Sequence, residues 1–195
     1  DEQRAILNVE DAFLAVIKDL KATYDGKKTK NLCLTHGDLH PGSVMVSAEG
    51  RIKVIDPEFN VYGPPGLDVG SLLSGYVLAA VHQVYAENPN AVKTLNDAAR
   101  ALWVAYKSGL EKSGLAADLI AETEVDTLGF TVAEVCRTAL GHAGGRLWLQ
   151  FEDTKVKEAA LKAAMGIVRQ CMVARHEGGM ELLWKALDQL VSEMA

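Results

Sequence analysis

Apolar residues recur every three or four positions through most of the chain. This spacing places apolar side chains on one face of a helix, so each such segment predicts an amphipathic helix. In the last segment the repeat is carried by Leu183, Leu187, Leu190 and Met194. The predicted helices span residues 12–24, 72–85, 92–110, 125–149, 156–174 and 180–194. We therefore expect the chain after residue 68 to be helical.

The stretch from residue 32 to 59 has a different pattern, because its apolar residues alternate with others, as is typical of short strands. The three predicted strands hold Leu32 and Leu34, then Val44 and Val46, then Ile52, Val54 and Ile55. Gly50 lies between the last two strands and suits the positive φ of a hairpin turn. The fold class that follows is α+β, mostly α, with one short β segment.

The composition fits one compact unit in a reducing compartment. A chain of 195 residues, 49% of them hydrophobic, is large enough for one sizeable core or for one lobe of a larger protein. The net charge of −6, with scattered Lys and Arg, argues against nucleic-acid binding. Cys33, Cys136 and Cys171 are far apart and odd in number, which predicts a cytoplasmic protein with reduced thiols.

The longest uncharged run, residues 69–86, is eighteen residues and reaches the length of a short membrane span. It contains four polar side chains, Ser71, Ser74, His82 and Gln83. This polarity favours a buried helix of the core over a membrane helix. We therefore expect no membrane partner.

The polar residues best suited to chemistry gather in the β segment. They are His36, Asp38, His40, Ser43, Asp56 and Glu58, all within 23 residues. Asp38 follows an apolar strand in a loop flanked by glycines, where a ligand or another backbone segment can approach closely. Asp56 and Glu58 are two positions apart, and in an extended chain that spacing points both carboxylates the same way. Two oxygen ligands on one face suit Mg²⁺.

The spacing of these residues favours kinase-type phosphoryl transfer. That chemistry needs a carboxylate to accept the proton of the substrate hydroxyl, a polar side chain five residues later, and a metal-binding Asp after the next strand pair. Asp38, Ser43 and Asp56 match in order and spacing, with Ser in place of the Asn of protein kinases. A lone Asp in such a loop is more often a turn residue, so the interpretation depends on the combination.

Three motifs give the chain a family resemblance. HGDLHPGS at 36–43, VIDPEFNVYGPPGLDVG at 54–70 and DTLGF at 126–130 closely resemble the 5-methylthioribose kinase family, one branch of a protein-kinase-like group that includes aminoglycoside phosphotransferases and choline kinases. The resemblance covers about residues 30 to 142. It implies ATP-dependent phosphorylation of the 1-hydroxyl of 5-methylthioribose, a sugar substrate of methionine salvage.

The same resemblance implies roles for individual residues. Asp38 is the expected catalytic base, and Asp56 and Glu58, with Ser43, are expected to hold the Mg²⁺ that bridges the ATP phosphates. Asp68 is expected to brace the catalytic loop through backbone N–H groups. The two loop histidines are expected to act differently, with His36 as a structural hydrogen-bonder and His40 near the substrate. Similar enzymes form homodimers, so a homodimer is expected here as well.

The family also carries a basic pair near the substrate after the DTLGF motif. Here Arg137 matches the first position, but Thr138 occupies the second. Arg137 is therefore the predicted substrate-binding cation, and Arg146 is a candidate replacement for the missing charge.

Kinases of this type also need an N-terminal lobe with a glycine-rich loop and a phosphate-binding Lys. Only 37 residues precede Asp38, and neither GxGxxG nor GxxxxGK[ST] occurs in the sequence. We therefore expect residues 1–195 to be the C-terminal, catalytic lobe of a larger enzyme, with the nucleotide lobe absent and the isolated chain inactive.

Three alternatives remain open from the sequence. The kinase could act on another acceptor, such as an aminoglycoside, choline or homoserine. GDLH also contains the Asp-x-His pair of metal-dependent phosphoesterases, although the further histidines that such sites need are few. Finally, the lobe could be an inactive binding or dimerisation module, which the intact set of Asp38, Asp56 and Glu58 argues against.

Overall fold

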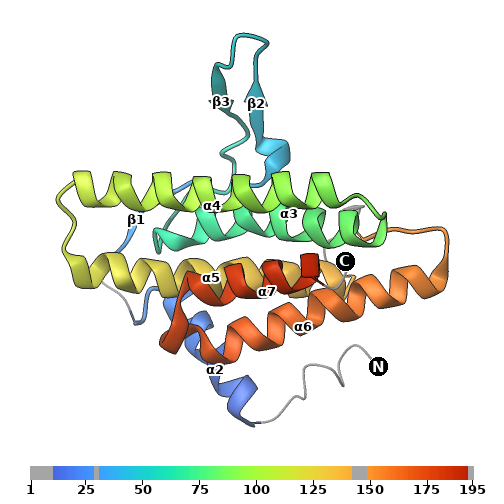
Figure 1. The fold of residues 1–195 in the computed structure, drawn as a ribbon. Coiled ribbons are helices and arrows are strands. Elements are labelled where there is room, and N and C mark those ends of the chain that lie inside the picture. The colour runs from blue at the N-terminus through green and yellow to red at the C-terminus, as the bar shows by residue number, and fades with distance from the viewer. Residues whose placement is uncertain (1–10, 29–30, 142–148, 193–195) are drawn as a thin grey trace.

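The computed structural model describes residues 11–28, 31–141 and 149–192, a helical bundle with a small β segment (Figure 1). The helices are α2 (Asp11–Tyr24), α3 (Gly66–Tyr85), α4 (Pro89–Lys112), α5 (Ala117–Ala139), α6 (Thr154–Gly178) and α7 (Met180–Ser192). The strands are β1 (Cys33–Thr35), β2 (Val44–Val46), β3 (Ile52–Val54) and β4 (Val61–Gly63), and a 3-10 turn, η1 (Pro41–Ser43), precedes β2.

Helix α3 is the central element of the bundle and packs against α4 and α5, while α6 packs against α5 and α7 packs against α6 and also contacts α3, α4 and α5. Its side chains Leu73, Val77 and Leu78 are completely buried. The α3–α5 contact is close because α3 presents glycine there. A Cβ on Gly70 would lie 2.7 Å from the carbonyl oxygen of Thr127, so a larger residue would separate the two helices. Although α3 has the length and hydropathy of a membrane span, it is the core helix of this bundle.

Helix α2 is joined to the bundle by a buried ion pair. The side chain of Arg175 on α6 has no exposed surface, and its Nη2 donates to Oδ2 of Asp19 on α2 at 2.6 Å. Phe13 and Leu20 of α2 also join the hydrophobic core. Helix α2 is therefore an integral part of the bundle.

The β segment consists of two antiparallel pairs. Strand β2 pairs with β3, with Val44 opposite Val54 and Val46 opposite Ile52, and the resulting hairpin projects from the helical body (Figure 1). Gly50 in its turn has a φ of 76°, the positive value that the sequence predicted. Strand β1 pairs with β4, which brings residues 33–35 beside residues 61–63.

The helix and hairpin predictions are confirmed, with changes at the boundaries. Helix α5 begins at Ala117, eight residues before the predicted start at 125, and ends at Ala139; the predicted continuation through 142–148 lies outside the described residues. Strand β4 was not predicted, because it is only three residues long and its partner β1 is distant in sequence. The fold class, mostly α with a small β part, agrees with the prediction.

Candidate active site

The loop after β1 carries Asp38 and is held by a carboxylate of helix α3. Asp68, in the first turn of α3, accepts hydrogen bonds from the backbone N–H of His36 at 2.6 Å and of Gly37 at 2.9 Å. This is the contact that the family resemblance implied for Asp68. Gly37 has a φ of 86°, and a Cβ there would lie 2.0 Å from the carbonyl oxygen of Phe59. The loop backbone is therefore fixed from two sides.

His36 connects this loop to the end of β3. Its Nε2 lies 2.8 Å from the carbonyl oxygen of Ile55, and because a carbonyl only accepts, Nε2 carries the proton and donates. The other ring nitrogen, Nδ1, is buried and has no hydrogen-bond partner. This arrangement agrees with a structural role, and it places the Asp38 loop next to the residue that precedes Asp56.

Ser43 makes a second connection between the same two segments. Its hydroxyl donates to the carbonyl oxygen of Asp38 at 3.2 Å, and its own carbonyl accepts from the N–H of Ile55 at 2.9 Å. Only 3% of Ser43 is exposed. The hydroxyl thus holds the loop in shape in this structure, and the role of Ser43 as a metal ligand stays a prediction.

Asp56 and Glu58 differ from the expectation based on an extended chain. Asp56 has a φ of 67°, in the left-handed region, so the chain turns there and the two-residue spacing no longer aligns both side chains. Both residues are exposed. In the described part of the chain, no group of three or more His, Cys, Asp or Glu side chains is arranged to hold a metal ion. The expected convergence of Asp38, Asp56 and Glu58 is therefore not seen, and their metal assignment stays a prediction.

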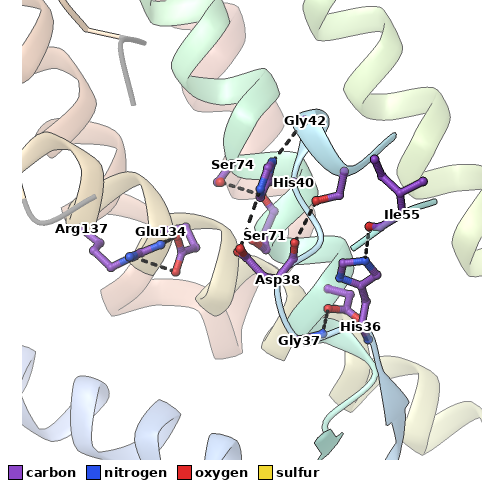
Figure 2. A network of polar contacts seen from close by, with 12 residues as sticks. His36, Gly37, Asp38, His40, Gly42, Ile55, Ser71, Ser74, Glu134 and Arg137 are labelled. Carbon is purple, nitrogen blue, oxygen red and sulfur yellow. Dashed lines mark hydrogen bonds and ion pairs between the residues drawn. The ribbon is translucent and has the colours of Figure 1, made fainter. Parts of the chain in front are cut away.

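The imidazole ring of His40 faces Asp38. Its Nε2 lies 3.8 Å from Oδ2 of Asp38, and its Nδ1 accepts from the N–H of Gly42 at 3.0 Å (Figure 2). Both side chains are partly exposed, His40 by 36% and Asp38 by 40%. Asp38 and His40 therefore form one polar pair that a ligand can reach.

Helix α5 contributes a second pair beside this loop, Glu134 and Arg137 (Figure 2). Arg137 Nη2 donates to Oε2 of Glu134 at 2.7 Å, and Nε donates to the same oxygen at 3.1 Å. Glu134, together with the more distant charge of Asp38, raises the pKa of Arg137, whereas burial lowers it. The charge of Asp38 thus acts on Arg137, and the role of Arg137 as a substrate-binding cation stays a prediction. Arg146 lies outside the described residues.

Sequence reasoning missed Glu134 as a member of this site. Glu134 and Arg137 are three positions apart, so both fall on the same face of a helix and can form an ion pair. That spacing was visible in the sequence, but it did not indicate that this face of α5 lies beside Asp38. Only the packing of α5 against α3 brings the pair to the loop.

The β segment around the loop exposes many large apolar side chains. Between residues 21 and 68, no described residue contributes a buried side chain to the hydrophobic core. From residue 32 to residue 62, the exposed large apolar residues are Leu32, Leu34, Met45, Val46, Ile52, Val54, Ile55, Phe59, Val61 and Tyr62. Both strand pairs thus leave large apolar side chains exposed, unlike the helical bundle.

Comparisons with known proteins give a consistent result. A model of the phosphotransferase enzyme family matches residues 1–103. A methylthioribose kinase of Exiguobacterium sibiricum is 34% identical over 155 residues, which cover 73% of this chain and 40% of the relative. The methylthioribose kinase of Erwinia tasmaniensis is 35% identical over 180 residues, with 80% and 43% covered. That of Geobacillus sp. strain WCH70 is 29% identical over 185 residues, with 90% and 45% covered. The chain spans less than half the length of these relatives.

Proposed function

The chain belongs to the phosphotransferase enzyme family, and on that premise we propose that it is the C-terminal, catalytic lobe of an ATP-dependent kinase that phosphorylates the 1-hydroxyl of 5-methylthioribose. The observation that carries the proposal is the loop at Asp38. Asp68 fixes its backbone, and both His36 and Ser43 bind it to Ile55, the residue before Asp56. The names of the relatives support the sugar acceptor.

In the proposed reaction Asp38 accepts the proton of the sugar hydroxyl as that oxygen attacks the terminal phosphorus of ATP. The bond between this phosphorus and the bridging oxygen of ADP breaks, and ADP leaves. Arg137 of α5, which is paired with Glu134, is the cation nearest in role to the acceptor in this proposal.

Asp56 and Glu58 are the residues that would hold Mg²⁺. Their exposed carboxylates offer the hard oxygen atoms that this ion prefers, so the donor chemistry fits. When bound, the ion neutralises charge on the phosphates. Asp56 follows Ile55, whose backbone N–H and C=O are both bound by the Asp38 loop. These bonds fix the position of the Asp56 backbone relative to that loop.

The exposed apolar surface of the β segment supports the nucleotide lobe that the proposal requires. Ten large apolar side chains between residues 32 and 62 are exposed, and many exposed apolar residues in one segment are typical of a surface that another part of the protein covers. The relatives are more than twice the length that this chain matches, which leaves room for such a lobe. We propose that the lobe covers this surface and that the isolated 195 residues lack kinase activity.

One observation favours a second acceptor class within the same family. Glu134 neutralises Arg137, the one cation that the structure describes at the predicted substrate position. A site with carboxylates and little uncompensated positive charge suits a cationic acceptor, such as an aminoglycoside or choline. The acceptor panel below separates this class from the sugar.

The test is ADP release by the complete kinase with methylthioribose, ribose, choline and kanamycin offered side by side. We expect turnover with methylthioribose and a loss of about 10²- to 10⁴-fold in kcat for Asp38→Asn with an unchanged circular-dichroism spectrum. Activity of Asp38→Asn equal to that of the parent would remove Asp38 from its role. Phosphorylation by the isolated 195-residue chain would overturn the two-lobe proposal.

The family resemblance also leads us to propose a homodimer located in the cytoplasm. Light scattering of the complete kinase, with a monomer mass as the contrary result, tests the assembly.

A further inference from the structure

We propose that His40 is a positioning residue for Asp38, and that it holds the carboxylate in the orientation needed to accept the substrate proton. This inference rests on the proposed kinase function, and it gives His40 a task other than binding substrate. Figure 2 shows the two contacts that carry it, one from each nitrogen of the imidazole ring.

The first contact determines where the ring proton sits. The backbone N–H of Gly42 donates to Nδ1 of His40 at 3.0 Å, so Nδ1 must be an acceptor without a proton. In the neutral ring the proton is then on Nε2. Nε2 lies 3.8 Å from Oδ2 of Asp38, so the ring presents an N–H to the carboxylate.

This tautomer also excludes a competing role. Nε2 already carries a proton and Nδ1 is engaged by Gly42, so the neutral ring has no nitrogen left to take a proton from a substrate hydroxyl. Asp38 is the neighbouring group with that capacity. The contact at 3.8 Å is longer than a hydrogen bond, and such contacts in ligand-free sites commonly shorten when the reactants bind.

The packing of the loop gives independent support. A Cβ on Gly42 would lie 2.8 Å from Cε1 and 3.0 Å from Nδ1 of His40, so the ring rests against the glycine. Pro41, between His40 and Gly42, packs in the same way against Gly75 of α3. A Cβ on Gly75 would lie 2.5 Å from Cγ of Pro41. Glycines at both contacts allow the loop and the imidazole to pack closely, which sets the side of the ring that faces Asp38.

Three substitutions of His40 distinguish the contributions of its two ring nitrogens. Gln carries an amide that can replace the Nε2–H donor, Asn can replace only the Nδ1 acceptor, and Ala replaces neither. In the complete kinase with saturating methylthioribose and ATP, we expect His40→Ala and His40→Asn to lower kcat by about 10- to 100-fold, because a misplaced catalytic group costs rates of this order. His40→Gln should recover most of that loss, and KM for both substrates should change by less than about 3-fold.

Gly42→Ala tests the packing with the imidazole still present. The added methyl group displaces the ring, so kcat should fall as it does in His40→Asn. Gly109→Ala in α4 is the matched control, because a Cβ there meets no atom within 4 Å and the residue is far from the site in sequence; its kcat should not change.

Each outcome has one meaning. A raised KM for methylthioribose with unchanged kcat in all three His40 variants would make His40 a substrate ligand and overturn the proposal. Equal kcat for parent and all variants would also overturn it. If the parent enzyme phosphorylates none of the offered acceptors, the kinase function itself fails, and that result is distinguishable because it precedes any substitution. A parent active on choline or kanamycin would leave the His40 test intact with that acceptor.

Discussion

The helical bundle and the β segment are built from similar apolar residues but bury them very differently. In the bundle, Leu73, Val77, Leu78 and Leu128 have no exposed surface. In the β segment, Val46 and Ile52 are 64% and 67% exposed although they face each other across the hairpin. The bundle thus completes its own core, whereas the β segment is a surface that lacks a cover within the described residues. The loop that carries Asp38 lies where these two regions meet, because Asp68 of α3 binds its backbone.

The largest expected change in stability is in the core of the helical bundle. Leu128→Ala removes a fully buried side chain of α5, and we expect it to lower the free energy of unfolding by about 2 to 5 kcal/mol, because the cavity left behind cannot fully collapse. Urea denaturation followed by circular dichroism measures the change. A loss below about 1 kcal/mol would show that the bundle core is loosely packed at this position.

Asp126 gives the bundle a pH dependence. Burial, followed by the charge of Glu122, raises the pKa of Asp126 from its ordinary value of 3.8 to about 6. The folded state therefore holds this proton more tightly than the unfolded state, so the contribution of Asp126 to stability is greatest below about pH 4 and is lost as the pH rises to about 6.

Asp126→Asn removes this titration, and unfolding experiments between pH 4 and 8 provide the measurement. Above pH 6 we expect the variant to be more stable than the parent by up to about 3 kcal/mol, since one pKa unit corresponds to about 1.4 kcal/mol. Asp97→Asn, which removes an exposed carboxylate of α4, is the control for the loss of one negative charge. A variant curve parallel to that of the parent at Asp126 would contradict the assigned pKa.

A smaller effect is expected at the junction of the two regions. Asp68→Asn replaces a carboxylate that accepts two backbone hydrogen bonds by an amide with one oxygen, and should cost about 1 to 2 kcal/mol. Amide hydrogen exchange at His36 and Gly37 should accelerate, while exchange in α3 beyond its first turn should stay unchanged. Unchanged exchange at both loop amides would mean that the loop does not depend on Asp68.

The smallest effect is expected in the hairpin. Ile52→Ala removes a side chain that is already mostly exposed, so the stability of the isolated chain should change by less than about 0.5 kcal/mol. In the complete kinase the same substitution should cost more if the nucleotide lobe covers this surface. Equal, small losses in both contexts would count against the proposed cover.

The two regions also differ in how far their sequence predicts them. Helices such as residues 92–110 were predicted because their burial follows the helical repeat, with Val92, Ala99 and Trp103 on the inner face. Strand β4 and the turn at Asp56 were not, since a three-residue strand has almost no periodicity and a positive φ at Asp is uncommon. Local pattern therefore predicts an element well when its own residues determine its burial.

The candidate site shows the same limit. The motif at residues 36–43 indicated which residues matter, but the partners of Ser43 and His40 depend on loop geometry that residue types do not determine. The position of Glu134 depends on helix packing over long sequence distances. These contacts are tertiary, and the sequence pattern alone does not contain them.

Ile55 connects two segments that the proposed reaction uses. Its N–H donates to the carbonyl of Ser43 and its C=O accepts from the ring of His36, so this one residue links the Asp38 loop to the segment that carries Asp56 and Glu58. A shift of Asp56 and Glu58 would either carry the Asp38 loop with it or break these two hydrogen bonds. In the proposed kinase, nucleotide binding at Asp56 and Glu58 would then change the position of Asp38, and the two substrates would bind in a preferred order.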